Sequence, residues 1–251
     1  MSGSISSTGM RRSSKSWIGI AFFCLLVASG LATAILIYRE PGGGGPAQPA
    51  ELLPDFNQTR ARAEAGEAQA QNFLGEIYAE GKQVKRDFRE AIQWYRKAAD
   101  QGLARAQYNL GVLYDIGQGV PQDEAEAARW YRQAAERGSA DAQYTLASMY
   151  GLGRGVPRVP KEALRWYERA AEQGDALARY NLAERYERGK DVAPDLAEAY
   201  KWHSLAAERG LKEAAAARVS LGRRISSDQM AEARKRIRDF NEKFPARTQS
   251  R

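Results

Sequence analysis

Residues 104–138 read ARAQYNLGVLYDIGQGVPQDEAEAARWYRQAAERG, and this stretch decides the fold. Its first part carries apolar residues at steps of three and four, which predicts an amphipathic helix over residues 104–114. The apolar face of this helix contains Ala106, Leu110, Leu113 and Tyr114. Glycines at 117 and 119 and a proline at 121 follow. They predict a turn and not a nucleotide site, because the strand and lysine that accompany such sites are missing from this context.

A second helix is expected from about Glu124 to Arg137. Asp123 is placed to cap its N-terminus, and Gly138 suits the left-handed residue that ends a helix. Its buried face is expected to contain Ala127, Trp130, Tyr131, Ala134 and Ala135. The small residues allow two helices to approach closely, and the large ones fill the space between them. One such hairpin cannot bury its own apolar stripe, so neighbouring hairpins must cover it.

The same pattern returns every 36 residues. The repeated glycines are Gly66, Gly102, Gly138, Gly174 and Gly210, the tryptophans are Trp94, Trp130, Trp166 and Trp202, and the leucines are Leu74, Leu110, Leu146 and Leu182. A fixed period of this length predicts a solenoid of stacked helical hairpins, in which we expect the tryptophans to be buried. A solenoid fills its interior with its own repeats and acts through its outer faces. The sequence therefore favours a scaffold or binding protein.

These units resemble Sel1-like repeats, relatives of tetratricopeptide repeats with a longer internal loop. The matching residues are A-x-A-Q-Y-N-L-G-x-L-Y from Ala104, G-x-G-V-P-x-D from Gly117 and A-x-x-W-Y-x-x-A-A-E-x-G from Ala127. The resemblance covers about residues 66–210, as units 67–102, 103–138, 139–174 and 175–210. It implies an all-α solenoid of four repeats and adaptor work in protein assembly, often at membranes, in endoplasmic-reticulum quality control or bacterial envelope signalling.

Some positions depart from the repeat pattern. Unit three has Val159 where an aspartate cap is expected, followed by Pro160, which the first turn of a helix tolerates. Units one and four have Gln83 and Asp191 in place of the second loop glycine. His203 stands where the other units have a tyrosine, and we interpret it as a packing substitute and not as a catalytic base.

The segments that flank the repeats are expected to be caps. Residues 51–65 predict a helix over unit one, and residues 211–244 predict capping helices, the last of which begins with a capping box at Ser226 and Gln229. The apolar face of that last helix contains Met230, Ala233, Ile237, Phe240 and Phe244. Its basic residues Arg234, Lys235, Arg236 and Arg238 are expected to face solvent. Residues 245–251 are expected to form a disordered tail.

Residues 17–38, WIGIAFFCLLVASGLATAILIY, contain no charged residue. As a helix they would reach about 33 Å, enough to cross a hydrocarbon core of about 30 Å. The basic tail 1–16 would lie in the cytoplasm, and the rest of the chain outside it, because basic residues stay on the cytoplasmic side. A cleaved signal peptide is the alternative, but its apolar region is usually shorter. Residues 39–50, rich in glycine and proline, are expected to be a flexible tether.

The net charge of +7 is confined to the two ends. Residues 17–217 carry 25 basic and 27 acidic residues, so the repeats are nearly neutral and nucleic-acid binding is not expected. The chain has one cysteine, Cys24, and one histidine, His203, so the sequence indicates no zinc, haem or iron–sulfur site and no cofactor. Its alanine- and arginine-rich composition suits a bacterium, which predicts an inner-membrane protein whose repeats lie in the periplasm.

In tetratricopeptide relatives the first helices of the units line a concave groove that binds peptides, and the resemblance implies the same use here. The residues expected to line the groove are Arg105, Tyr108, Asn109, Val112, Asp115, Tyr144, Tyr180, Asn181 and Glu184. Solvated polar residues without a partner are the alternative interpretation of these positions. The predicted function is a non-enzymatic scaffold for a protein or peptide partner. The alternative is an envelope enzyme, or an enzyme activator, that acts on peptidoglycan or polysaccharide. An acidic or histidine-containing pocket would favour that alternative.

Overall fold

The computed structural model describes residues 55–81 and 83–245, which form helices and the connections between them. These residues contain eleven helices and no strand, in agreement with the all-α prediction. The helices are α1 (Phe56–Glu64), α2 (Ala68–Glu80), α3 (Phe88–Asp100), α4 (Ala104–Ile116), α5 (Glu124–Glu136), α6 (Ala140–Leu152), α7 (Pro160–Glu172), α8 (Ala176–Arg188), α9 (Leu196–Ala207), α10 (Lys212–Gly222) and α11 (Ser227–Lys243).

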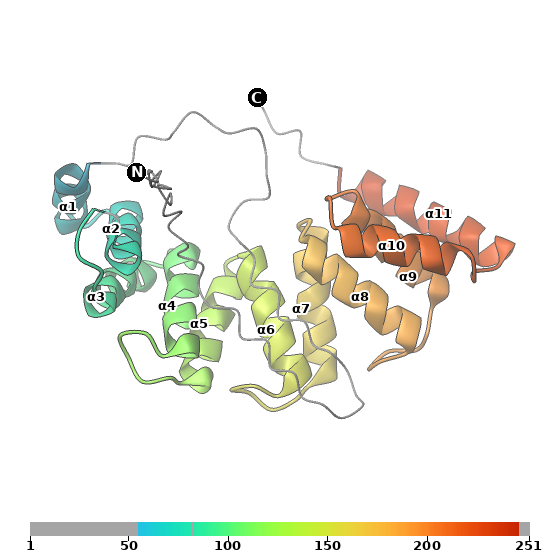
Figure 1. The fold of residues 1–251 in the computed structure, drawn as a ribbon, viewed down its shortest axis with the longest axis horizontal. Coiled ribbons are helices and arrows are strands. Elements are labelled where there is room, and N and C mark those ends of the chain that lie inside the picture. The colour runs from blue at the N-terminus through green and yellow to red at the C-terminus, as the bar shows by residue number, and fades with distance from the viewer. Residues whose placement is uncertain (1–54, 82, 246–251) are drawn as a thin grey trace, which may run out of the picture. The chain divides into compact units, whose positions relative to one another are not determined.

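Four antiparallel hairpins follow one another along the chain (Figure 1). The pairs are α2 with α3, α4 with α5, α6 with α7 and α8 with α9, and the second helix of each pair packs on the first helix of the next. The solenoid predicted from the 36-residue period is therefore confirmed within the described residues. The first helices are α2, α4, α6 and α8, and the second helices are α3, α5, α7 and α9.

The interior of each hairpin combines one fully buried leucine with several alanines, and the first three hairpins add one buried tyrosine, whereas the fourth has His203 in its place. Leu74, Leu110, Leu146 and Leu182 are all completely buried. On α4, Gly111 lies against the ring of Tyr131, where an added Cβ would come within 2.7 Å of Tyr131 Cδ1. The absence of a side chain at Gly111 thus makes room for the tyrosine ring of the same hairpin. The alternation of small and large residues has the packing role expected from the sequence.

The predicted caps of the second helices are present in three of the four repeats. The side chains of Asp87, Asp123 and Asp195 accept hydrogen bonds from backbone N–H groups of the first turns that follow them. At the start of α7, Val159 provides no such bond, and Pro160 occupies the first turn. The third repeat therefore lacks a stabilising contact that its neighbours share.

Replacing Val159 by aspartate should stabilise the protein by about 0.5–2 kcal/mol, the usual value of a side-chain N-cap. Val159 is partly exposed, and its backbone is close to the extended conformation of the three aspartate caps, so the new carboxylate meets no buried apolar surface. Urea denaturation followed by helical circular dichroism measures the difference. Val159→Asn is a matched uncharged cap, and a urea denaturation curve unchanged in both variants would contradict the prediction.

The tryptophans are not equally buried, which corrects one expectation. Trp166 and Trp202 are 4% and 5% exposed, whereas Trp94 and Trp130 are only half-buried. The neighbouring tyrosines Tyr95 and Tyr131 are the deeply buried residues of the first two repeats. Burial of an indole depends on what covers it, and the ring of Phe240 in α11 lies 5.2 Å from that of Trp202.

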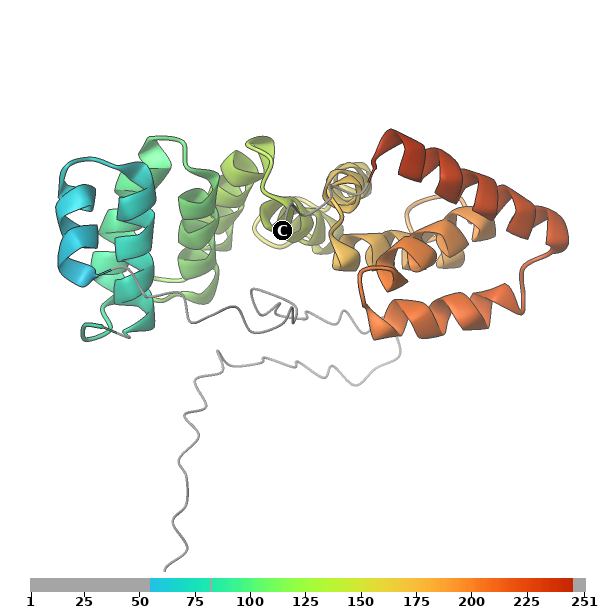
Figure 2. The same cartoon turned by 90° about the horizontal axis from the view of Figure 1, so that it is seen from above.

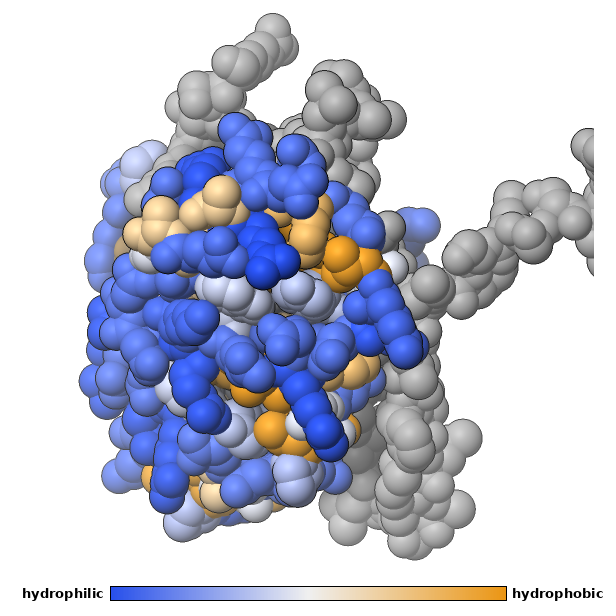
Figure 3. Space-filling view, turned by 90° about the vertical axis from the view of Figure 1, so that its left-hand side faces the viewer, coloured by the Kyte–Doolittle hydropathy of each residue, from blue (hydrophilic) through white to orange (hydrophobic). Residues whose placement is uncertain are grey.

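The ends of the row are covered by additional helices. α1 lies within the predicted cap segment and packs on α2, while α10 and α11 both pack on α9 (Figures 1 and 2). The face at the α1 end is mainly hydrophilic, with hydrophobic residues in small separate patches (Figure 3). At the other end, Ser226 and Gln229 form the predicted capping box of α11. Ala233 and Phe240 of its apolar face are buried.

Arg236 corrects the expectation that the basic residues of α11 face solvent. Its guanidinium lies 2.7 Å from an oxygen of Asp195, the N-cap residue of α9, and 3.1 Å from an oxygen of Glu198 in the first turn of α9. Arg234, Lys235 and Arg238 are exposed as expected. Arg236 instead joins α11 to the start of α9, because the carboxylates of that cap lie directly opposite it.

The predicted membrane segment 17–38, the tail 1–16 and the tether 39–50 lie outside the described residues. Of the helices that the structure does describe, none has the length and apolar character needed to cross a membrane.

Candidate functional site

The nine residues predicted to line a partner groove all lie on α4, α6 and α8, and we refer to them as the first-helix face. Arg105 is exposed, and the other eight are half-buried. A half-buried side chain packs part of its atoms against the protein and exposes the rest to solvent. These residues lie on first helices, as the sequence indicated, and several of them already have partners within the chain.

Polar contacts between successive first helices order part of this face. Asn109 Nδ2 donates to Asn72 Oδ1 at 3.0 Å, and Arg105 Nε lies 2.8 Å from Glu76 Oε1. Both contacts join α4 to α2. Asn181 Nδ2 lies 3.4 Å from the hydroxyl of Tyr144, which joins α8 to α6. The two asparagine amides are thus held in place by the preceding repeat.

Aromatic contacts hold other residues of the face. The ring of Tyr108 lies 5.5 Å from the ring of Tyr131, and the ring of Tyr144 lies 5.7 Å from that of Tyr167. Burial raises the pKa of Tyr144 above its usual value, because the phenolate form would lose its hydration. These pairs repeat from hairpin to hairpin and fix the tyrosines as rigid elements of the surface.

Asp115 has a different environment from the rest of the face. Its carboxylate lies 2.7 Å from Arg154, which belongs to the loop of the third repeat and also contacts Glu124 at 3.0 Å. Burial raises the pKa of Asp115, and the guanidinium of Arg154 acts against this shift. Asp115 therefore serves a contact between repeats, and its charge is not free for a ligand.

The loop glycines act as the predicted turns. Gly155 has a φ of +63°, and a Cβ placed there would lie 2.1 Å from the carbonyl oxygen of Glu124. The loop of the third repeat thus touches the backbone of the second repeat directly, which only glycine allows.

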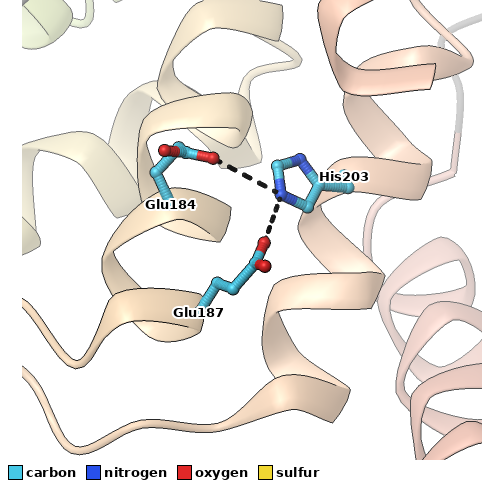
Figure 4. A group of neighbouring side chains, drawn as sticks. All are labelled: Glu184, Glu187 and His203. Atoms are coloured by element: carbon cyan, nitrogen blue, oxygen red, sulfur yellow. Dashed lines mark ion pairs between the residues drawn. The ribbon is translucent and has the colours of Figure 1, made fainter. Parts of the chain in front are cut away.

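His203 lies beside two glutamates of the adjacent helix (Figure 4). The residue is completely buried, and its Nε2 lies 3.4 Å from Glu187 Oε2 and 4.0 Å from Glu184 Oε1. Its ring also packs on the ring of Tyr180 at 5.4 Å. Burial lowers the pKa of His203, although Glu187 acts in the opposite direction. Burial thus favours the neutral imidazole, in which one nitrogen carries a lone pair.

A separate hollow is lined by acidic, basic and aromatic residues of α7, α9 and α11. Glu198 in this hollow is ion-paired with Lys201 and Arg236. Burial raises the pKa of Glu168, and the charges of Glu172 and Glu198 add to this effect. Trp202 contributes part of the wall. The sequence did not predict this hollow, because its walls come from three helices that are far apart in the chain.

The sequence model of the Sel1 repeat matches residues 68–103, 104–139, 140–175 and 176–211, which together make up more than half of the chain. The chain belongs to the Sel1 repeat family. The resemblance stated from the sequence is thereby confirmed. Each matched segment contains one of the four hairpins. Sel1 repeat proteins generally mediate protein–protein interactions.

Several solved structures are similar to this Sel1 repeat protein, and two of them share more than a third of its residues in the aligned region. One is c5321, a protective antigen of uropathogenic Escherichia coli with an SLR fold; it is 40% identical with a TM-score of 0.62, over 64% of this chain and 34% of that one. The other is a Sel1 repeat protein from Oxalobacter formigenes, 37% identical with a TM-score of 0.59, over 63% of this chain and 68% of that one. The comparison with curated proteins found no match.

The fourth Sel1 repeat differs from the others where α8 faces α9. His203 stands at the position that is tyrosine in the other repeats, namely Tyr95, Tyr131 and Tyr167. Glu187 stands at the position occupied there by Ala79, Asp115 and Gly151. Sequence reasoning named Glu184 and His203 separately and did not name Glu187. The signal that could have found the group is the combination of two glutamates three residues apart with a histidine in the position of the repeated tyrosine.

Proposed function

We propose that this Sel1 repeat protein is a platform that binds a protein or peptide partner through the first-helix face. The anchor would be residues 17–38, with the N-terminus in the cytoplasm and the repeats in the periplasm. Family membership supports protein binding as the general role. The charge pattern supports the orientation, because Arg11, Arg12 and Lys15 precede the apolar segment. Envelope signalling or the assembly of protein complexes would be its role there.

One observation carries the choice of this face. The asparagines of α4 and α8 are held by the first helix of the preceding repeat, through Asn109 with Asn72 and Asn181 with Tyr144. Side chains that are already ordered lose less conformational entropy when a partner binds. Asn109 can still donate and accept hydrogen bonds to the backbone of an extended peptide, because one N–H of its amide is engaged with Asn72. The Nδ2 of Asn181 donates to Leu177 O and to the Tyr144 hydroxyl, so the carbonyl oxygen of this amide would accept from the peptide. The face thus offers fixed polar groups between half-buried tyrosine rings.

The alternative function, an envelope enzyme, requires an acid and a base that both reach a substrate. His203 is completely buried, so a polysaccharide does not reach it. The hollow beside α11 is acidic, as the enzyme alternative requires, with Glu168, Glu172, Glu198 and Asp239 in its lining. Glu198 is ion-paired with two cations, and Glu172 and Asp239 are exposed, so Glu168 is the one half-buried carboxylate of this lining whose pKa is raised. The geometry therefore favours binding over hydrolysis.

Site-specific photocrosslinking in intact cells tests the proposal. A photoreactive residue is introduced at Arg105 on the first-helix face, and in a second strain at Arg129 on α5, because both side chains are mainly exposed, at 63% and 73%. We expect a discrete protein adduct from position 105 and not from position 129. The adduct should be lost in the double variant Asn109→Ala, Asn181→Ala, whose stability falls by only about 1 kcal/mol per lost hydrogen bond.

Two outcomes contradict the proposal separately. Equal adducts from positions 105 and 129, or an adduct that survives the double asparagine substitution, would reject the first-helix face as the binding surface. For the anchor, the full chain should remain with membranes after alkaline carbonate extraction, and a variant that lacks residues 1–38 should not. Release of the full chain by carbonate would reject membrane anchoring without affecting the conclusion about the binding face.

A further inference from the structure

Glu184, Glu187 and His203 bring three metal-ligating side chains together inside the fourth repeat. The two glutamates lie three residues apart on α8, so their side chains share one face of that helix. His203 on α9 points its Nε2 towards both of them (Figure 4). One ligand atom from each residue lies within 4.8 Å of the other two. No other group of this kind occurs in residues 55–81 and 83–245.

The state of His203 points to a ligand independently of the two acids. The residue is completely buried, and neither ring nitrogen makes a hydrogen bond of acceptable geometry. A buried polar atom without a hydrogen bond costs free energy, so such atoms are rare in native proteins and call for an explanation. A metal ion between Nε2 and the carboxylates would give this nitrogen a partner.

The distances suit a small divalent ion. Zinc binds imidazole nitrogen and carboxylate oxygen at about 2.0–2.2 Å in tetrahedral geometry, which places two ligand atoms about 3.4 Å apart. His203 Nε2 and Glu187 Oε2 are separated by 3.4 Å. Glu184 Oε1 is 4.0 Å from the same nitrogen, so a small rotation of this half-buried side chain completes the set. The fourth position would be left to a water molecule.

Two arginines hold the outer oxygens of these carboxylates. Arg188 lies 2.6 Å from Glu184 Oε2, and Arg224 lies 2.5 Å from Glu187 Oε1. The oxygens closest to His203 are the other ones, Oε1 of Glu184 and Oε2 of Glu187. Partners of this kind orient the ligands of metal sites and fix which oxygen faces the ion. We infer that Glu184, Glu187 and His203 form a binding site for a divalent transition-metal ion such as Zn²⁺.

The other repeats show that packing alone does not require this trio. A tyrosine occupies the position of His203 in each of them. In the second and third repeats its ring makes the same contact with a tyrosine of the first helix that His203 makes with Tyr180. In the third repeat, Tyr167 is buried although the first helix carries an alanine, Ala147, and not a glycine. The fourth repeat has the equivalent alanine, Ala183. Tyrosine therefore has a precedent at position 203, whereas the nitrogen of His203 is a feature of the fourth repeat.

The test is zinc titration of residues 1–251, purified without a histidine tag and in a Cys24→Ser background, so that His203 is the one imidazole and no thiol is present. Calorimetry should show one zinc per chain, and Co²⁺ should give the visible absorption of a tetrahedral site. His203→Tyr, Glu184→Gln and Glu187→Gln should each weaken zinc binding about tenfold or more. Glu76→Gln is the matched control, because Glu76 occupies the position of Glu184 in the first repeat, and it should leave zinc affinity unchanged.

Thermal melting without metal separates loss of binding from loss of fold. His203→Tyr restores the residue of the other repeats and should melt as cooperatively as the parent chain. If it does not, Glu187→Gln decides: weakened binding with unchanged melting supports the site, and retained binding rejects it. The inference is also overturned if the parent chain binds no zinc at one equivalent, or if His203→Tyr binds zinc as tightly as the parent chain.

Discussion

Trp166→Ala should lower the free energy of unfolding by about 3–5 kcal/mol, as expected for removal of a fully buried aromatic side chain. Trp166 is 4% exposed and belongs to the largest cluster of buried side chains, which runs from α5 to α9 and includes Phe240 of α11. The guanidinium of Arg169 also lies 4.7 Å from the centre of its ring. Loss of the indole would leave a cavity between hairpins, and the cavity adds to the loss of apolar burial.

Trp94→Ala provides the matched comparison. Trp94 occupies the same repeat position but is half-buried, so we expect a smaller loss, about 1–2 kcal/mol. Urea denaturation followed by circular dichroism measures both variants, and the slope of each transition shows whether the chain still unfolds as one cooperative unit. Equal losses for the two variants would mean that the exposure of the indole does not determine its contribution.

The 36-residue period was sufficient to predict the hairpins, because the features that define them are local. Helix caps such as Asp123 and the leucine at Leu110 act within one turn or one hairpin, and both have the predicted role. The unequal burial of the tryptophans was beyond the sequence, since it depends on which neighbouring element covers each ring. Trp202 is covered by Phe240, which lies outside the repeats altogether.

The candidate sites divide in the same way. The helical period placed Asn109 and Asn181 on the first helices, but it could not show that Asn72 and Tyr144 hold them, because those contacts join different repeats. The environment of His203 also arises between two helices. Its replacement of a tyrosine was visible in the sequence and was interpreted as packing, but the absence of hydrogen bonds to its nitrogens is a property of the folded chain alone.

Asp191→Ala should lower the free energy of unfolding by about 3–5 kcal/mol, the usual effect of removing one partner of a buried ion pair. Asp191 Oδ2 lies 2.8 Å from Arg185, and the two side chains are 11% and 10% exposed. Oδ1 accepts a 2.5 Å hydrogen bond from Arg158 in the loop of the third repeat. Without the carboxylate, the guanidinium of Arg185 stays buried with its charge uncompensated. The alanine must also adopt the positive φ of 66° found here.

Asp191→Gly separates the two causes, because glycine adopts positive φ freely and is the residue at the equivalent positions 119 and 155. It should recover about 1 kcal/mol of the loss in the alanine variant, and the remainder measures the missing carboxylate. Arg185→Met removes the buried charge instead and should be less harmful than Asp191→Ala, since no unpaired ion is then left inside. A glycine variant as stable as the parent chain would contradict the prediction. It would mean that the contacts of Arg158 and Arg185 with Asp191 add nothing to the free energy of unfolding.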